Sequence, residues 1–366
     1  MEKQLVLRNV QTVQGTSLDI VVENGRIAAI TPANSAQGDK VYDGSGQYVS
    51  SGWIDMHVHA VPGLDPYGDE IDEIGVKQGV ATIVDAGSCG ADRIGELAQD
   101  AARAKTNVLA FLNISHIGLE RIDELSNLDW IDAERVMEAL GSYRDIIVGL
   151  KARISRSVVK EQGVEPLRRA RKLSLDTSLP LMVHIGSGPP GIEQVISLLE
   201  KGDIVTHYLN GKANNLFTPD GNPLPALQEA IARGVHLDVG HGTASFSFRV
   251  AEFARRHGIA PNTISSDIYR GNRLNGPVYS LAHVMSKFLL LGYSLNEVIA
   301  AVTEAAAVWL GKPELGRIQV GDPAHLTLFT VTEGDIELTD SEGETRIAKR
   351  YIEPKGVVVH GSFTAC

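Results

Sequence analysis

Residues 52–59 read Gly-Trp-Ile-Asp-Met-His-Val-His, an apolar run that ends in two histidines. The run predicts a strand, and on a strand positions i and i+2 point to the same side. We therefore expect His57 and His59 to project together, so that their imidazoles can hold one cation. Because His-x-His also occurs by chance on exposed strands, this pattern alone leaves a structural role open.

Further short apolar runs follow, and each ends at a polar or glycine-rich position. With the first run included, these ends lie near His57, Asp85, Asn113, Lys151, His184, His207, Val239 and Asp267. They are 23 to 38 residues apart, the length that one strand, one helix and two loops require. Helices are expected between them, for example at 132–143, 165–175, 192–200 and 248–257. Eight such units predict an α/β fold of the TIM type, a closed (β/α)8 barrel.

A last helix is expected to begin at Ser294, where Ser294-Leu295-Asn296-Glu297 forms a capping box, and to end near Gly311. Both ends of the chain are expected to be β-structure. Asn24-Gly25 between the apolar runs 18–22 and 26–30 predicts a hairpin. Near the other end, strands are expected at 325–331, 335–338 and 356–360. These patterns predict a small β-sandwich domain made from 1–50 and 315–366, beside a barrel domain at 51–314.

Barrel enzymes place their chemistry at the carboxyl ends of the strands. Here His184, His207 and Asp267 end apolar runs, as the first histidine pair does. A single polar residue at such a place often caps a helix or satisfies a loop. Four histidines and an aspartate at the same end of one barrel instead favour a metal site.

Lys151 is unusual because it occupies an expected strand position. A buried ammonium group is costly unless it is paired, and it would repel a cation. If carbon dioxide carboxylates the amine, the resulting carbamate is an anion that can bridge two metal ions. The alternative is that Lys151 lies just past the strand, in solvent.

The six candidate metal ligands follow one another along the chain in the order His57, His59, Lys151, His184, His207 and Asp267. In this order they resemble the ligands of the amidohydrolase superfamily with a binuclear, carboxylated-lysine metal centre. Residues 51–55 resemble the family's lead-in to its first histidine pair. Residues 316–326 resemble the return to its small β-domain, although His325 stands where the family usually has Asp.

The resemblance implies a division of roles among these side chains. His57, His59 and Asp267 would hold one divalent metal ion, and His184 and His207 would hold the other. Carboxylated Lys151 would bridge the two, along with a hydroxide. From this set of six ligands we further expect Asp267 to act as general base and then general acid. Zinc suits histidine and carboxylate ligands best, with manganese, cobalt and iron as alternatives.

Within the family, dihydroorotases usually carry an arginine two residues after the second histidine, but this chain has Val61 there. Residues 206–211, 240–248 and 266–269 instead resemble the deacetylase branch, which is often labelled dihydroorotase-like. This branch implies hydrolysis of a C–N amide bond, and specifically deacylation of an N-acyl amino acid or a similar acyl compound. An ester or lactone hydrolase, a cyclic amide hydrolase and a non-catalytic scaffold remain as alternatives.

The expected small-molecule substrate carries a carboxylate, for which a guanidinium group is the best-matched partner. Arg153, two positions after Lys151, and Arg270 are the candidates, although Arg153 could equally form an ion pair on a loop. Asn210, Gly211 and Ser245 are expected to supply further donors. Family habit implies a homo-oligomer.

The composition excludes some classes of partner. Apolar residues make up 43% and charged residues 22%, and the net charge of −11 comes without a basic stretch, so neither nucleic acid nor an anionic bilayer is an expected partner. No apolar run is long enough to span a membrane, and no secretory signal is visible. Only Cys89 and Cys366 are present, which favours a reducing cytoplasm.

Overall fold

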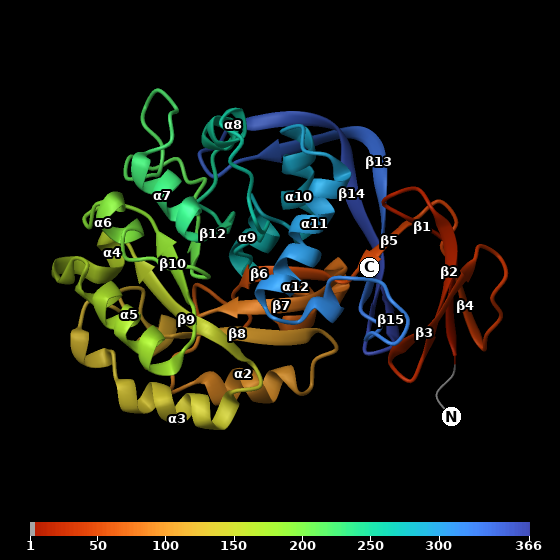
Figure 1. Ribbon diagram of the computed structural model, residues 1–366, viewed down its shortest axis with the longest axis horizontal. Helices are drawn as coiled ribbons and strands as arrows, with labels where there is room; N and C mark the ends of the chain where they lie inside the picture. Colours follow the sequence, from red (N-terminus) through yellow and green to blue (C-terminus); the bar gives the residue numbers. More distant parts are fainter. Residues whose placement is uncertain (1–3) are drawn as a thin grey trace.

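A curled parallel sheet forms the centre of the computed structural model, which describes residues 4–366 (Figure 1). Its seven strands are hydrogen-bonded in sequence order: β6 (Trp53–Val58), β7 (Val80–Ala86), β8 (Asn107–Asn113), β9 (Ile147–Ile154), β10 (Leu181–Ile185), β11 (Ile204–Thr206) and β12 (His236–Asp238). Every neighbouring pair is parallel. The strands are almost continuously buried, as expected for a parallel sheet covered on both faces.

The segment 263–268 bridges the two edges of this sheet. Thr263 forms a parallel bridge with Asp238 in β12, and Ile268 forms one with Val58 in β6. In the same segment, the Asp267 amide donates to the His57 carbonyl at 2.7 Å. The sequence predicts an eighth strand here, but the structure has an extended segment with isolated bridges. The structure therefore has a curled parallel sheet of seven strands whose edges this segment links, and the closed eight-stranded barrel stays a prediction.

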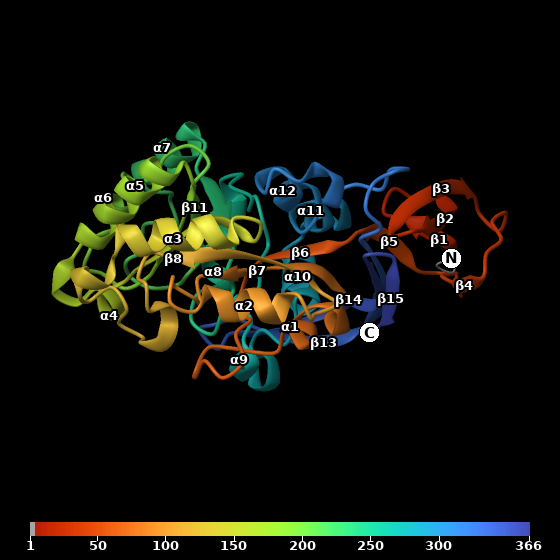
Figure 2. The same cartoon turned by 90° about the horizontal axis from the view of Figure 1, so that it is seen from below.

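Helices surround the parallel sheet (Figures 1 and 2). The α-helices are α1 (Ile71–Ile74), α2 (Ile94–Ala101), α3 (Ala133–Tyr143), α4 (Arg156–Val159), α5 (Glu165–Thr177), α6 (Ile192–Ile196), α7 (Pro225–Arg233), α8 (Phe248–Arg256), α9 (Arg270–Asn275), α10 (Leu281–Leu290), α11 (Leu295–Ala301) and α12 (Glu304–Trp309). Helices α3, α5 and α8 lie where the sequence predicts them, whereas α6 ends at Ile196, four residues early. The Asp132 side chain caps α3 by accepting from the amides of Glu134 and Arg135.

The prediction of one continuous helix from Ser294 to Gly311 is wrong. The segment begins with the expected capping box, but the chain breaks into α11 and α12 at Val302 and Thr303. The carbonyl of Val302 accepts a hydrogen bond from the Ile54 amide at 2.7 Å, so β6 uses an acceptor at the point where the helix would have continued. This contact between residues far apart in sequence has no local signal.

A second, mixed sheet is built from both ends of the chain, as the sequence predicts. Its strands are β1 (Leu5–Thr12), β2 (Ser17–Glu23), β3 (Arg26–Pro32), β4 (Lys40–Asp43), β5 (Tyr48–Ser51), β13 (Leu326–Thr339), β14 (Thr345–Val359) and β15 (Ser362–Ala365). The predicted hairpin joins β2 to β3, and Asn24 and Gly25 both adopt positive φ there. Leu7, Ile20 and Leu328 belong to an apolar core separate from that of the barrel. A two-layer sandwich stays a prediction.

The hairpin of β13 and β14 reaches from the terminal sheet across the barrel (Figure 1). The strands predicted at 325–331 and 335–338 form one strand, because a bulge near Gly334 lets pairing with β14 continue. At the hairpin tip, Asp340 accepts a hydrogen bond from the Phe248 amide at the start of α8. Strand β14 also packs against α10. The predicted domain boundaries stay a prediction, since this hairpin contacts both parts of the molecule.

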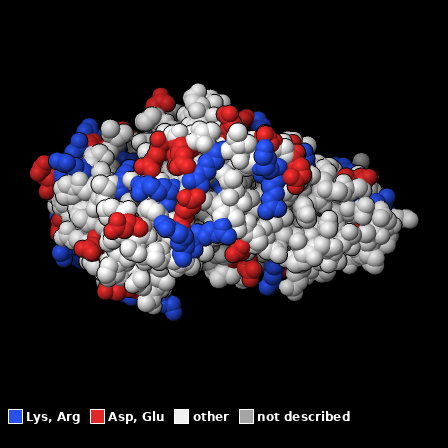
Figure 3. Space-filling model, turned by 90° about the horizontal axis from the view of Figure 1, so that it is seen from above, with Lys and Arg blue, Asp and Glu red and all other residues white. Residues whose placement is uncertain are grey.

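The molecular surface carries mixed charges. Figure 3 shows Lys and Arg side chains interspersed with Asp and Glu over one face, without an extended field of one sign. Among residues 4–366, no helix combines the length and apolar character that crossing a bilayer requires.

Candidate metal centre

Six side chains that the sequence predicts as metal ligands converge at the carboxyl ends of the parallel strands. They come from β6 and the residue after it, from β9, from β10, from the residue after β11, and from the segment 263–268: His57, His59, Lys151, His184, His207 and Asp267. Lys151 lies within β9 and is buried, so the alternative that it sits in solvent is wrong.

The distances around His57 are short. Lys151 Nζ lies 3.2 Å from His57 Nε2. Asp267 Oδ1 lies 3.5 Å from the same nitrogen and 3.2 Å from His59 Nε2. An amine, a carboxylate and two imidazoles therefore face one another within the reach of a shared cation.

The His207 ring shows which of its nitrogens can bind a metal. Its Nδ1 donates to the Gly240 carbonyl at 2.6 Å, and since a carbonyl only accepts, Nδ1 carries the proton. Its Nε2 therefore has a lone pair, and this atom is buried without a hydrogen-bond partner among residues 4–366. Single ligand atoms of His57, His207 and Asp267 lie within 4.8 Å of one another. Because an unpaired buried acceptor is costly, this group fits a bound cation.

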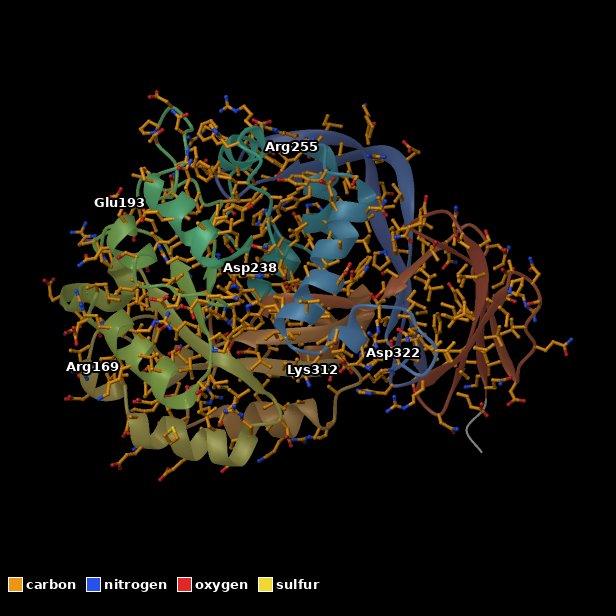
Figure 4. The ribbon with its side chains drawn as sticks, in the orientation of Figure 1. Arg169, Glu193, Asp238, Arg255, Lys312 and Asp322 are labelled. Carbon is orange, nitrogen blue, oxygen red and sulfur yellow. The ribbon has the colours of Figure 1, made fainter. Side chains whose placement is uncertain are left out.

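A buried hydroxyl and a buried carboxylate orient His57 from behind. The Thr206 hydroxyl donates to Asp238 at 2.7 Å and lies 3.0 Å from His57 Nδ1. Since the only proton of this hydroxyl goes to Asp238, it accepts from Nδ1–H, which leaves the lone pair on Nε2 for the metal. Figure 4 shows Asp238 in the middle of the barrel, whereas Arg169 and Glu193 lie on its outer helices. The roles of Thr206 and Asp238 were not predicted from the sequence, where the available signal was that polar residues end β11 and β12.

His59 is oriented by a loop at the end of β7. Its Nδ1 lies 2.7 Å from the Ser88 hydroxyl, and the Ser88 amide donates to Asp85 at 2.7 Å. The other oxygen of Asp85 accepts from the Ala60 amide at 2.8 Å. In the sequence, Asp85 is distinguished only as the end of an apolar run. In the structure, its carboxylate joins the loop behind His59 to the chain just after that histidine.

Two of the six residues hold strained backbone conformations. His207 has φ of 69° and Asp267 has φ of 51°, in the left-handed region that non-glycine residues rarely adopt. Such conformations cost about 1–3 kcal/mol each and persist where the surrounding structure enforces them. Here that strain turns an imidazole and a carboxylate toward the cluster.

Burial sets the protonation states in the cluster. It lowers the pKa values of His57, His184 and His207 well below the ordinary range, so these rings are neutral at pH 7. Burial also lowers the pKa of Lys151 to about 7, against the attraction of Asp267. Burial raises the pKa of Asp267, but the imidazoles, His57 first, outweigh it and bring this pKa below its usual value. Neutral imidazoles and an ionised carboxylate are the forms that bind a metal ion.

A cavity of about 240 Å³ is lined by five of the six residues, all except His207. Of the predicted substrate-binding residues, Arg153 and Ser245 line it as well. The guanidinium group of Arg153 donates to both carboxylate oxygens of Glu124, at 2.7 and 2.8 Å. The ion-pair alternative for Arg153 is therefore present in the structure, although the pair lies beside the cavity.

The other three predicted substrate-binding residues lie outside this lining. Asn210 is buried, and its amide donates to the His207 carbonyl at 2.8 Å. Gly211 packs so closely against the hairpin tip that a Cβ atom there would overlap the Glu342 carboxylate. Arg270 is half-exposed and lies 3.7 Å from Asp69. Their contribution to substrate binding stays a prediction.

Several cavity residues had no predicted role. The most distinctive are Tyr67, Tyr269 and Lys212. The Tyr67 ring lies 5.8 Å from that of His59 and 5.3 Å from that of Tyr269, so two aromatic side chains form part of the wall. Lys212 directly follows Asn210-Gly211, and its position after a metal-ligand run was the signal available in the sequence.

Comparison with known proteins gives full-length relatives. A deacetylase of Enterococcus faecalis is 42% identical over 99% of both chains. A crystal structure described as an adenine deaminase superposes with a TM-score of 0.96, at 41% identity over 99% of both chains. One described as a dihydroorotase superposes with a TM-score of 0.92, at 34% identity over 100% of this chain and 99% of that one. A family model for a deacetylase-like composite domain matches residues 318–363.

The curled parallel sheet, with imidazoles and a carboxylate at its carboxyl edge, defines a hydrolase of carbon–nitrogen bonds other than peptide bonds. The similarity to full-length relatives identifies the family and branch to which the chain belongs. The chain belongs to the amidohydrolase superfamily, in the branch that contains the deacetylases.

Proposed function

We propose that the protein removes an acyl group, in the simplest case acetyl, from an N-acyl amino acid or a similar small acyl compound. The observation that carries this proposal is the Asp267 carboxylate, 3.2 Å from His59 and 3.5 Å from His57 in a cavity of about 240 Å³. A cavity of this size suits a small molecule. The deacetylases among the full-length relatives support acyl removal.

The six clustered residues fit two divalent metal ions, with zinc the best match for their chemistry. His57, His59 and Asp267 would hold one ion, His184 and His207 the other, and a carbamate on Lys151 would bridge them. Bound metal ions supply a nucleophile at neutral pH and polarise the acyl carbonyl.

Lys151 is suited to carboxylation. With a pKa of about 7, a substantial share of its amine is neutral near pH 7, and the neutral amine is the form that attacks carbon dioxide. The new bond joins Nζ to the carbon, and the amine loses one proton. The product is an anion in place of an ammonium group, which suits a site that also holds cations.

Asp267 would move the proton that amide hydrolysis requires. An amide nitrogen leaves poorly unless it is protonated. Asp267 would take a proton from the attacking water as general base and return it to the leaving nitrogen as general acid. Its position against two imidazoles fixes the carboxylate at the cavity floor.

Opening of a cyclic amide is a second candidate, because one full-length structural relative is described as a dihydroorotase. The arginine that dihydroorotases usually carry is replaced here by Val61, which is buried and apolar. We therefore place acyl removal first. The partner we propose is a small molecule bearing a carboxylate.

Metal analysis of the purified protein, followed by a screen of N-acyl-D- and N-acyl-L-amino acids with matched esters and dihydroorotate, tests the proposal. We expect about two divalent ions per chain and release of the acyl group from at least one amide. A protein loaded with two metal ions that hydrolyses only the esters, or only dihydroorotate, would contradict it.

A further inference from the structure

Lys212 brings a positive charge to the wall of the cavity. An ideal Cβ built on Gly186 would lie 3.5 Å from Lys212 Nζ and 3.4 Å from His184 Nε2. The two nitrogens therefore flank the same face of Gly186, and the ammonium group lies beside the metal-ligand cluster. The side chain is half-buried and lines the cavity.

The backbone of Lys212 is fixed on both sides by asparagine side chains. Its amide donates to Asn210 Oδ1 at 3.1 Å, and its carbonyl accepts from Asn215 Nδ2 at 2.7 Å. Asn210 is itself bonded to the His207 carbonyl, so the loop is anchored to a predicted metal ligand. Three hydrogen bonds with asparagine side chains therefore hold the backbone segment that carries this lysine.

The other cations of the cavity already have partners. Arg153 is paired with Glu124 through two hydrogen bonds, and Lys151 belongs to the ligand cluster. Within residues 4–366, no carboxylate lies within 4.0 Å of Lys212 Nζ. Partial burial lowers the pKa of Lys212, and Asp267 raises it. A desolvated ammonium group without a counterion gains from a ligand that brings one.

A hydroxyl-bearing side chain lies on the same side of Gly186. The buried Ser155 side chain approaches the Gly186 position, with its Cβ 3.0 Å from the ideal Cβ. Among residues 4–366, its hydroxyl has only a long contact of 3.4 Å, to the Ser157 hydroxyl. Ser155, Ser157 and Ser187 all line the cavity. A cavity lined by an ammonium group and several serine hydroxyls is a suitable environment for a carboxylate.

We propose that Lys212 binds the carboxylate of the substrate and thereby makes the enzyme select anionic N-acyl compounds over neutral ones. The inference rests on the proposed function for the identity of the substrate. An α-carboxylate lies two bonds from the acylated nitrogen, so an anchor beside His184 leaves the acyl group near Asp267. Lys212 thus takes the carboxylate-binding role for which Arg153 and Arg270 are the candidates from sequence.

A binding experiment separates the charge preference from turnover. The probes are N-acetylglycine and its neutral counterpart N-acetylglycinamide, measured by saturation-transfer NMR on the metal-loaded protein, which also reports any acetate released. We expect the wild type to bind the carboxylate at least tenfold more tightly, Lys212→Met to bind both within twofold, and Lys212→Arg to keep most of the preference. Lys172→Met, which removes an exposed lysine on α5, is the matched control and should match the wild type.

A wild type without a carboxylate preference, or a Lys212→Met protein that keeps it, overturns the inference. If the protein binds the carboxylate more tightly but releases no acyl group from any compound in the substrate screen, Lys212 still forms an anion-binding site, but the proposed reaction is contradicted. For the best N-acyl amino acid in that screen, Lys212→Met should raise KM at least tenfold and change kcat less than threefold. Equal losses with the acid and with its primary amide would indicate a structural role and also overturn the inference.

Discussion

His57 and His207 are the histidines whose tautomer the fold fixes most clearly. In each, Nδ1 donates to a defined acceptor, the Thr206 hydroxyl or the Gly240 carbonyl, and Nε2 is left as the ligand atom. Asp267 differs, because its carboxylate faces the Nε2 atoms of two imidazoles and its own backbone is strained. This difference separates residues that bind metal from the one that can also exchange a proton.

Asp267→Asn should lower kcat by at least about a thousandfold while metal content stays close to that of the wild type. The amide still offers an oxygen to the metal, but it cannot accept the proton of the attacking water. Metal analysis and initial rates on the same preparation provide the check. Substantial remaining turnover at full metal content would refute the assigned role.

Lys151→Ala should lose metal and activity together, because the variant cannot form the bridging carbamate. A short carboxylic acid such as acetate or propionate could occupy the space and restore part of both. Metal content and rates measured with increasing acid concentration test this. If Lys151→Ala binds two metal ions without added acid, the bridging role is wrong.

At the scale of elements, the loop after β12 lies between the metal cluster and the tip of the β13–β14 hairpin. The Ser341 hydroxyl donates toward the Gly242 carbonyl at 3.0 Å, and the Ser247 hydroxyl donates to Glu342 at 2.6 Å. On its other side, this loop packs directly against Asp267. The hairpin from the terminal sheet therefore supports the loop that packs against Asp267.

Gly242→Ala should lower kcat by more than its loss of folding free energy alone would explain. Gly242 has φ of 53°, and a Cβ there would overlap the Asp267 carboxylate. The backbone conformation alone costs about 1–2 kcal/mol, and the displaced carboxylate adds a loss of kcat. Thermal unfolding and initial rates should be measured in parallel.

Gly46→Ala is the matched control for backbone strain. Gly46 also has a positive φ, of 76°, but a Cβ there would meet no atom of residues 4–366 within 4 Å. We expect this variant to lose a similar free energy of unfolding and to keep its activity. If both variants keep full activity, the loop does not position Asp267.

At the scale of the whole molecule, the two sheets meet where β5 leads into β6. The Gly52 amide donates to the His325 carbonyl at 2.8 Å, which links the two ends of the terminal sheet to the first barrel strand. The His325 side chain is buried, and its ring packs edge to face on that of His360 with centroids 4.8 Å apart. Neither ring nitrogen of His325 has a hydrogen-bond partner among residues 4–366.

The junction should weaken in acid. Burial, and secondarily His360, lowers the pKa of His325 from 6.5 to about 4. Between these pH values the unfolded chain binds a proton that the folded chain excludes, so the free energy of unfolding falls as the pH falls. A pKa difference of this size corresponds to at most about 3 kcal/mol.

His325→Leu should flatten the dependence of Tm on pH between 6.5 and 4, because leucine cannot take up the proton. His257→Gln, at an exposed position on the end of α8, is the control and should keep the wild-type slope. Unfolding followed by circular dichroism at several pH values provides the measurement. An unchanged slope in His325→Leu would show that other groups cause the acid sensitivity.

The spacing of polar positions along the chain determined the parallel sheet and the six clustered residues. Parallel strands that follow one another in sequence bring their carboxyl ends to one edge, so residues that end successive apolar runs must meet there. This reasoning succeeds even for Lys151 and Asp267, which lie 116 residues apart in the chain. The Asn-Gly hairpin and the capping box at Ser294 were predictable for a local reason, since each depends on a few adjacent residues.

Only the tertiary structure decided which polar groups were already engaged. Arg153 meets Glu124 across 29 residues, and His57 meets Thr206 across 149, and no local pattern encodes such pairs. The break between α11 and α12 and the closing segment 263–268 likewise depend on contacts with β6. The sequence therefore specified which residues reach the catalytic edge, because periodicity is local. Only the packed structure shows which charged groups remain unpaired and available to a substrate, because ion pairing depends on distance in space.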